Sequence, residues 1–340
     1  MIELSERRLR EIFKNISGKR VAIIGDLMLD RYIWGIVNRI SPEAPVAVVD
    51  VQTEQDRLGG AANVAKNIQS LGGEPFLIGV IGDDSNGETL TKLSRECHFL
   101  EEGIVKDSTR PTTVKTRIIA HNQHVVRIDH ESKLDISKSI QEKILKILRQ
   151  NIADFDAIIV EDYNKGVVTK PLIHDVIALA EKHDKVINID PKFHNFFEYT
   201  NVSVFKPNRK EIEEALGVKI FGDEDAVRAA KEVIHRLKAK NVLLTRGENG
   251  MSLIDESGGV YHAPTKARNI ADVSGAGDTV IATLTLAMAG GASVREAATL
   301  ANYAGGVVCE FVGIVPIEKE LLRSAVLNNG ALPKPRKDKR

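Results

Sequence analysis

An aspartate follows a run of small residues in the C-terminal third of the chain, where residues 272–279 read DVSGAGDT and lead into an apolar helical stretch. Small residues let the backbone turn tightly, and the unpaired N–H groups at a helix N-terminus favour a bound anion. Asp278 would lie in the first turn of this helix, beside an anion that its carboxylate repels. A base that takes a proton from an attacking hydroxyl group explains that position. The simpler alternative is a carboxylate that only satisfies the helix dipole.

Two further segments could bind a polar ligand. Residues 59–63 read GGAAN ahead of a second helical stretch, where the glycines would let a ligand approach the backbone and the asparagine can both donate and accept hydrogen bonds. Residues 25–30 read GDLMLD and place two aspartates just past the first strand, at the edge where open α/β sheets bind ligands. The positions that predict a site for hydroxyl groups, such as those of a sugar, are Asp26, Asp30, Gly59, Gly60 and Asn63.

Two common phosphate-binding signatures are missing from the sequence. No Gly-x-x-x-x-Gly-Lys-Ser/Thr segment occurs, and the first strand is not followed by Gly-x-Gly-x-x-Gly. The sequence therefore gives no support to P-loop phosphoryl transfer or to ordinary dinucleotide binding.

Composition indicates an ordinary globular enzyme without a strong electrostatic preference. The 340 residues include 47 Lys plus Arg and 47 Asp plus Glu, so the formal net charge is zero and gives no attraction to nucleic acid or membranes. No stretch approaches the roughly 18 apolar residues of a membrane span, and the N-terminal segment is too charged for a secretory signal. We therefore expect a cytoplasmic protein whose two cysteines, Cys97 and Cys309, are reduced and largely buried.

These candidate residues are positioned by strands and helices that alternate along the chain. Residues 19–27 contain an almost unbroken apolar run, which is typical of a buried strand in a parallel sheet covered on both faces. The alternation predicts an α/β fold with a doubly wound, mostly parallel sheet and right-handed crossovers. Further strands are expected at 75–81, 157–160, 186–190, 202–205 and 242–245, and helices at 6–15, 61–71, 88–97, 137–150, 170–183, 225–239, 277–289, 294–310 and 318–326.

Two stretches do not fit a doubly wound sheet. Residues 46–52 and 112–129 contain segments in which apolar and polar side chains alternate, which indicates strands with one face buried and the other exposed. We expect a small separate sheet, from about residues 31–52 and 111–130, that acts as a lid. Residues 1–330 would then form one domain, and the basic residues 331–340 a flexible tail.

Over essentially its full length the chain resembles the PfkB (ribokinase) family of carbohydrate kinases. Residues 59–65 (GGAANVA) and 272–279 (DVSGAGDT) look like the two family signatures. Residues 206–211 (KPNRKE) match the family's Asn-x-x-Glu element, and residues 245–250 (TRGENG) resemble its glycine-bearing turn near the nucleotide. The resemblance implies a ribokinase-like fold, with ATP and Mg²⁺ as cofactors and Asn208 and Glu211 positioning the metal through water. The nucleotide-site residues that it implies are Asn208, Arg209, Lys210, Glu211, Thr245, Gly247 and Gly250.

Within this family the chain is most similar to the kinase domain of the heptose enzymes of lipopolysaccharide synthesis. The matching segments are residues 25–32, 39–46, 122–123, 162–166 and 190–192. Those enzymes phosphorylate the anomeric hydroxyl of D-glycero-β-D-manno-heptose 7-phosphate, giving the 1,7-bisphosphate on the route to ADP-heptose. Many carry a fused adenylyltransferase domain with a His-x-Gly-His signature, which this sequence lacks. The resemblance therefore implies a kinase that acts without that domain.

The resemblance and the residue chemistry lead to one mechanism. Asp278 would take the proton of the sugar's 1-hydroxyl as its oxygen attacks the γ-phosphate of ATP in line, while the amides of Gly275, Ala276 and Gly277 bind the phosphoryl oxygens. Asp272 is a candidate ligand for a monovalent cation, as in some relatives, and the pairing of two lids would make a homodimer. The further residues proposed for the acceptor and its phosphate are Arg117, Arg127, Asp162, Lys165 and Lys192.

Two alternatives stay open on the sequence. A kinase of this family could instead accept fructose, ribose, a nucleoside or a hexose phosphate. The same scaffold could also serve as a nonenzymatic sugar- or nucleotide-binding regulator, although the retained Asp278 and its glycine turn argue against that.

Overall fold

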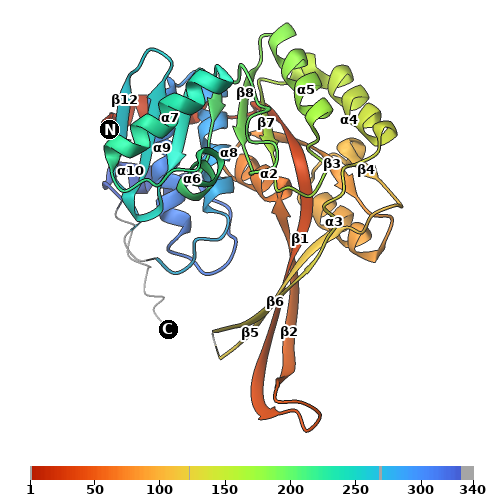
Figure 1. Cartoon of the computed structure of the whole chain (residues 1–340). Helices are drawn as coiled ribbons and strands as arrows, with labels where there is room; N and C mark the ends of the chain where they lie inside the picture. The colour runs from red at the N-terminus through yellow and green to blue at the C-terminus, as the bar shows by residue number, and fades with distance from the viewer. Residues whose placement is uncertain (1, 122, 268–269, 331–340) are drawn as a thin grey trace.

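The computed structural model describes residues 2–121, 123–267 and 270–330. A body of helices packed on a central sheet carries a narrow arm of strands that projects from it (Figure 1). Two parts of the sequence analysis, Asn122 and the basic segment 331–340, lie outside the described residues.

The central sheet of the body is mostly parallel. Its strands are β1 (Arg20–Ile40), β3 (Glu74–Ile81), β4 (Ile104–Lys106), β7 (Ala157–Glu161), β8 (Val186–Asp190), β9 (Val204–Phe205), β10 (Asn241–Thr245), β11 (Met251–Asp255) and β12 (Val260–Ala263). They lie in the order β12-β11-β10-β9-β8-β7-β1-β3-β4, with antiparallel pairing only at the β10-β11-β12 end of this described sheet. The expected doubly wound, mostly parallel α/β fold is confirmed, whereas the β11–β12 hairpin and β4 were not predicted.

Helices cover both faces of this sheet. They are α1 (Glu6–Asn15), α2 (Ala61–Ser70), α3 (Ser85–Glu96), α4 (Lys138–Asn151), α5 (Lys170–Lys182), α6 (Arg209–Leu216), α7 (Asp223–Leu237), α8 (Ala276–Ala289), α9 (Val294–Val308) and α10 (Lys319–Leu327), with short 3-10 turns at Glu101–Gly103, Ile152–Asp154 and Gly247–Asn249. Alternate side chains of β1 enter separate cores, because Val21 and Ile23 pack on one face and Ala22 and Ile24 on the other. Burial on both faces explains the apolar run in the sequence.

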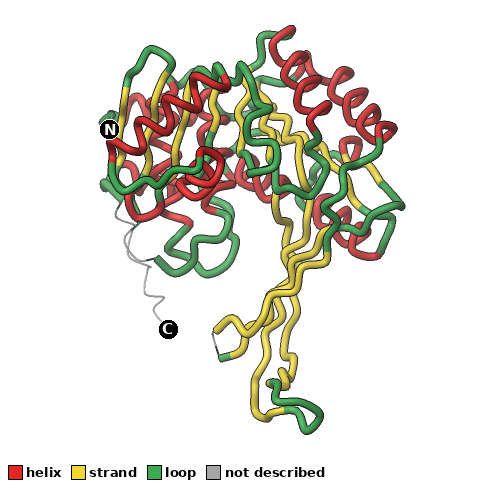
Figure 2. Tube along the Cα trace, in the orientation of Figure 1, coloured by secondary structure: helices red, strands yellow, loops and turns green. Residues whose placement is uncertain are grey.

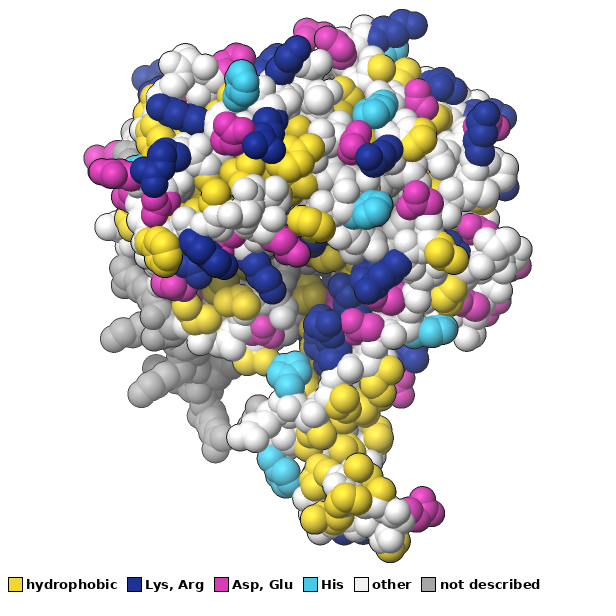
Figure 3. All heavy atoms as spheres, viewed as in Figure 1, with side chains coloured by type: hydrophobic (Ala, Val, Ile, Leu, Met, Phe, Trp, Pro, Cys, Tyr) yellow, Lys and Arg dark blue, Asp and Glu magenta, His cyan; other side chains and the backbone are white. Residues whose placement is uncertain are grey.

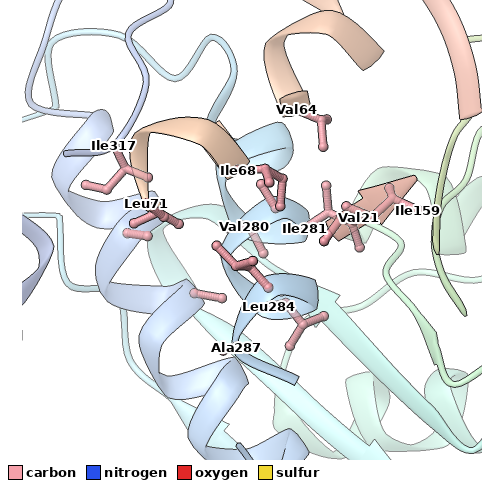
Figure 4. Close-up of a cluster of buried hydrophobic side chains, with 14 of the residues drawn as sticks. Val21, Val64, Ile68, Leu71, Ile159, Val280, Ile281, Leu284, Ala287 and Ile317 are labelled. Carbon is pink, nitrogen blue, oxygen red and sulfur yellow. The ribbon is translucent and has the colours of Figure 1, made fainter. Parts of the chain in front are cut away.

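One of these cores fixes α2 against α8. Val64 and Ile68 of α2 pack with Ile281 and Leu284 of α8, next to Val21 of the central sheet (Figure 4). The N-terminal turns of both helices carry predicted site residues, so this packing sets the distance between them.

The arm is an extension of the central sheet. It contains β2 (Ala47–Gly60), β5 (Thr113–Ala120) and β6 (Gln123–His130), together with the outer part of β1 (Figure 2). β1 pairs with both β2 and β5, and β5 pairs with β6. The sequence predicted a strand ending at residue 27 and separate lid strands from about residue 31. The structure instead runs one 21-residue strand through both sheets.

The arm has a polar face and an apolar face. In register, Asp30 of β1 lies beside Lys115 of β5, and Tyr32 lies beside Arg117. Residues paired in this way point to the same side of a sheet, and the next residue along each strand points to the other side. The opposite, more apolar face therefore carries Ile33, Ile118, Val126 and Ile128.

No helix among the described residues combines the length and the apolar character needed to cross a bilayer. Cys97 and Cys309 are free thiols. Both are mostly but not fully buried: Cys97, which caps the C-terminal end of α3, packs against the core, and Cys309 lines a cavity.

Candidate active site

The turn before α8 is shaped for an anion. Gly275 has a φ of +77°, a left-handed conformation that favours glycine. The amides of Gly277 and Asp278 fall in the first helical turn, where no earlier carbonyl of the helix can accept from them. The Ala276 amide donates to the Val273 carbonyl at a longer 3.3 Å. Free donors at the positive end of a helix suit a phosphoryl group.

Asp278 lies at this turn with both carboxylate oxygens engaged. The side-chain amide of Asn63 donates to Oδ2 at 2.7 Å, and the Tyr163 hydroxyl donates to Oδ1 at 2.7 Å. Asp278 is 3% exposed. Burial raises its pKa to about 6, although the two hydrogen bonds lower it and oppose that change. A carboxylate with a pKa near neutrality is a stronger base than an exposed aspartate and is still ionised at pH 7.

Asn67 holds the two helices that carry these groups. Its Oδ1 accepts from the Thr279 hydroxyl of α8 at 3.0 Å and from the Ile317 amide at 3.0 Å, while its Nδ2 donates to the Asn63 carbonyl at 2.9 Å. All of these groups are buried. The base and its amide partner are therefore fixed by a hydrogen-bond network as well as by packing.

Three buried carboxylates meet beside the turn. One oxygen each from Glu161, Asp190 and Asp278 lie within 4.8 Å of one another. Lys206 pairs with Asp190 at 2.7 Å, whereas both Glu161 oxygens are buried without a hydrogen-bond partner among the described residues. Burial, with the charges of Asp190 and Asp278, raises the pKa of Glu161 well above its usual value. Oxygen ligands of this kind fit Mg²⁺, which would satisfy the unpaired carboxyl group.

A cavity of about 520 Å³ opens from the turn. It is lined by Asp278 at one end and by the turn that follows β10. Arg246 and Cys309, which the sequence analysis did not select, also line it. All but one of the predicted nucleotide residues line this cavity: Asn208, Arg209, Lys210, Thr245, Gly247 and Gly250.

Glu211, the remaining predicted nucleotide residue, is used locally. Its Oε2 accepts from the Asn208 amide at 2.8 Å, and its own amide donates to Asn208 Oδ1 at 2.9 Å, which makes a capping box at the start of α6. Lys192 donates to its Oε1 at 2.6 Å. Because both oxygens are engaged, direct contact with a metal would require these bonds to break, so a contact through water fits better.

Asp26 binds the backbone of the loop that follows β7. Its carboxylate accepts from the backbone amides of Tyr163, Lys165 and Val167 at 2.7, 3.2 and 3.2 Å. Burial, and then the nearby Asp162, raises its pKa to about 6. In this structure Asp26 fixes the loop that carries Tyr163 and Lys165, and its contact with a sugar hydroxyl stays a prediction.

Three other predicted acceptor residues also have structural partners. A Cβ on Gly59 would lie 2.1 Å from Asp30 Oδ2. Gly60 has a φ of +57°, and a Cβ there would lie 2.5 Å from the Asp26 carbonyl oxygen of β1. Close packing on β1 therefore requires both glycines, and their contact with a ligand stays a prediction. Asp162 accepts from the Tyr199 hydroxyl at 2.6 Å in the interior.

Three of the predicted cations gather near the root of the arm and the carboxylate cluster. Arg117 donates to Asp30. Lys165 pairs with Glu131 at 2.7 Å, and Lys192 lies 5.1 Å from the centre of the Tyr163 ring. Figure 3 shows Lys and Arg side chains crowded at the place where the arm meets the body. Cationic side chains thus gather near the base, although each of these three is paired with a carboxylate.

The last two predicted residues bind groups of the protein itself. Arg127 pairs with Asp129 at 2.9 Å on β6, and 59% of its side chain is exposed. Asp272 accepts from the amides of Ser274 and Gly313 at 2.9 and 3.0 Å. Asp272 therefore ties a C-terminal loop to the anion-binding turn.

Four residues of the site were not predicted from the sequence: Tyr163, Glu161, Asp190 and Lys206. Their common signal is position, because each ends or directly follows a parallel strand of the sheet. The carboxyl ends of such strands face the ligand in open α/β sheets.

The sequence is similar to known kinases over most of its length. The model of the pfkB family of carbohydrate kinases matches residues 19–319. The bifunctional protein HldE of Pelobacter propionicus is 41% identical over 323 residues, which is 95% of this chain and 66% of that protein. HldE of Geobacter sulfurreducens is 42% identical over 91% of this chain and 63% of its own length. The chain thus spans slightly less than two thirds of the length of these relatives.

Solved structures show the same fold at lower sequence identity. Ribokinase of Arabidopsis thaliana, complexed with ribose and ATP, superposes with a TM-score of 0.71 at 19% identity, covering 93% of this chain and all of that one. Phosphofructokinase-2 of Escherichia coli with fructose-6-phosphate gives a TM-score of 0.73 at 18% identity, covering 92% and 99%. At these identities the similarity establishes the ribokinase-like fold.

Proposed function

This chain belongs to the pfkB family of carbohydrate kinases, and on that premise we propose that it phosphorylates the anomeric hydroxyl of D-glycero-β-D-manno-heptose 7-phosphate. The product would be the 1,7-bisphosphate, an intermediate toward ADP-heptose and the lipopolysaccharide core, made in the cytoplasm. The sugar-kinase assignment rests on the family. The heptose assignment is supported by about 41% identity to HldE proteins across nearly the whole chain.

The observation that carries the mechanism is the buried Asp278 held by Asn63 and Tyr163 beside the glycine turn. Its carboxylate takes the proton of the attacking hydroxyl group, and its raised pKa makes it an effective base near neutral pH. Amides of residues 275–277 bind the oxygens of the transferred phosphoryl group, whose charge changes during transfer. The cavity behind the turn would hold the rest of ATP.

The carboxylates beside Asp278 are suited to Mg²⁺. Glu161 and Asp190 would hold the ion, with Asn208 and Glu211 acting through water. When bound, Mg²⁺ neutralises charge on the phosphates of ATP. Lys206, paired with Asp190, adds a fixed positive charge at the same place.

The apolar face of the arm would bind a second copy of the chain. Val126 and Ile128 of β6 are 46% and 52% exposed, and Val51 of β2 is 57% exposed. Apolar strands on a projecting sheet are an aggregation risk unless another surface covers them. A homodimer in which two arms pack together would remove that risk.

The proposed reaction is tested by measuring ADP release from ATP and Mg²⁺ with a panel of acceptors. The panel contains the heptose 7-phosphate, fructose 6-phosphate, ribose 5-phosphate, fructose and ribose. We expect the highest kcat/KM with the heptose 7-phosphate and a 1,7-bisphosphate product by ³¹P NMR. A clear preference for ribose or fructose would reject the heptose assignment, and binding of ATP and sugar without any ADP would reject the kinase.

A further inference from the structure

Lys115 lies on the polar face of the arm, where the arm meets the body. It is paired in register with Asp30 of β1 and with Asp129 of β6, and it is partly buried. Its Nζ lies 4.7 Å from the centre of the Tyr163 ring. The sequence analysis did not select this residue, because an alternating strand gives no sign of which lysine reaches the body.

The carboxylates around Lys115 already have other partners. Asp30 accepts from Arg117, and Asp129 accepts two bonds from Arg127, each of 2.9 Å. Within the described part of the chain, no carboxylate lies within ion-pair distance of Lys115. Its Nζ lies instead over the face of the Tyr163 ring, which is a weak substitute for a counter-ion.

Two further cations lie close to Lys115. Burial lowers its pKa, and the charges of Lys165 and Arg117 lower it further against the opposing effect of Asp30. A partly buried cation that is held beside like charges destabilises the ligand-free protein unless an anion binds there. Unfavourable charge environments of this kind are common at binding sites.

Two anions could bind at Lys115: a phosphate of ATP or a phosphate group on the acceptor. The position of Lys115 distinguishes between them. The Tyr163 hydroxyl bonds to Asp278 at 2.7 Å, while Lys115 contacts the ring of the same tyrosine. An anion at Lys115 would therefore lie about one tyrosine side chain from the base. Lys115 is not among the residues that line the cavity behind the glycine turn, which favours the acceptor over the phosphates of ATP as the source of its anion.

We propose that Lys115, together with Arg117 and Lys165, binds the phosphate group that the acceptor already carries, and so selects phosphorylated sugars over free ones. The proposal rests on the proposed kinase function and extends it. The separation suits a sugar whose reacting hydroxyl and phosphate are at opposite ends of the molecule. Lys115 supplies the charge that lacks a protein partner, and the other two cations add hydrogen-bond donors.

The test uses Lys115→Met, which keeps much of the side-chain length and removes the charge. We measure kcat and KM for each phosphorylated acceptor and for the same sugar without phosphate. The loss of a charged hydrogen bond typically weakens binding by roughly 10–100-fold, so we expect a drop of that size in kcat/KM for phosphorylated acceptors, mainly through KM. Turnover of free sugars should fall much less than turnover of phosphorylated ones, and Lys115→Arg should recover much of the loss.

Lys92→Met on α3 is the matched control, because the Lys92 side chain is 75% exposed and its ion-pair partner is Glu96 on the same helix. It should leave all constants unchanged. Thermal melting without ligand checks folding, and Lys115→Met should melt no lower than the wild type because it removes an unpaired partly buried charge. If no acceptor is turned over, calorimetric titration with the same pairs of sugars gives the same comparison.

Equal effects of Lys115→Met on phosphorylated and free sugars, or no effect on either, would overturn the phosphate site. A wild-type preference for free sugars would overturn it as well. If another sugar phosphate is preferred to the heptose and Lys115→Met still weakens it selectively, the phosphate site holds and only the heptose assignment fails.

Discussion

The side-chain amide of Asn63 on α2 donates a 2.7 Å hydrogen bond to Asp278 Oδ2 on α8, although 215 positions separate the two residues in sequence. The Oδ1 atom of Asn63 is buried and has no hydrogen-bond partner among the described residues. One amide group thus orients the base and keeps an acceptor oxygen for a ligand. That oxygen can accept from the hydroxyl group that Asp278 deprotonates or from its neighbour.

Asn63→Ala should therefore lower kcat by roughly 10–100-fold, because the base loses its orientation. The hydrogen bond from Asn63 lowers the pKa of Asp278, so its removal should raise that pKa and move the acid limb of the rate profile to higher pH. Steady-state kinetics over a pH series measures both effects. Asn328→Ala, at an exposed asparagine after α10, is the control, and an unshifted acid limb in Asn63→Ala would contradict the role of the amide.

The wild-type rate should depend on pH through Asp278. The carboxylate form is the active base, and burial raises the pKa of Asp278 to about 6. We expect kcat/KM to be level above that pH and to fall about tenfold per pH unit well below it. A rate that stays level down to pH 4.5, with the fold intact by circular dichroism, would show that Asp278 isn't the titrating base.

The same pKa predicts a stability effect. A carboxyl group whose pKa is raised on folding binds its proton more tightly in the folded chain, so the stability it contributes is complete below pH 3.8 and is lost as the pH rises through about 6. Ionised Asp278 should then cost up to about 3 kcal/mol at pH 8. Asp278→Asn should raise the free energy of unfolding at pH 8, measured with urea and without Mg²⁺ or nucleotide, and the gain should shrink toward pH 4. A variant less stable than the wild type at pH 8 would contradict this.

Glu161→Gln tests the metal-binding carboxylates. Both oxygens of Glu161 are buried without a hydrogen-bond partner in the described structure, and glutamine has nearly the same shape, so the fold should be kept. We expect a higher Mg²⁺ concentration for half-maximal rate, because one anionic oxygen ligand is lost. Glu213→Gln on α6, whose carboxylate accepts from Lys219 and from the Ile220 amide instead, is the control. An unchanged Mg²⁺ dependence in Glu161→Gln would remove this residue from the metal site.

Val126→Asp tests the apolar face of the arm. A charge at this exposed strand position should separate the proposed dimer, because a buried, unpaired carboxylate is costly at an interface. Light scattering after size exclusion should give the mass of two chains for the wild type and of one chain for the variant. Val218→Asp, at a 41% exposed valine on the body, should leave the mass unchanged. A monomeric wild type would reject the dimer.

The parts of the fold that the sequence predicted are those set by local patterns. The apolar period marked most helices, and the helix that starts within DVSGAGDT begins at Ala276, one residue before its expected start. The base itself could be selected because a carboxylate beside an anion-binding turn conflicts with simple electrostatics.

The rest depends on contacts between distant segments. Nothing near Tyr163 shows that its hydroxyl reaches Asp278, and nothing near Lys115 shows that its neighbouring carboxylates are paired elsewhere. Asp26 was predicted to face a sugar because it follows a strand, but three backbone amides take up its oxygens. The continuous β1 was missed because its burial changes partway along the strand, from both faces to one.

The most direct test is the turnover of Asp278→Asn with ATP, Mg²⁺ and the preferred sugar acceptor. We predict that kcat falls by at least roughly 10²–10⁴-fold, the usual contribution of a general base, while calorimetry shows ATP binding close to that of the wild type. Turnover equal to that of the wild type would mean that another group removes the proton, and the account of this site would be wrong.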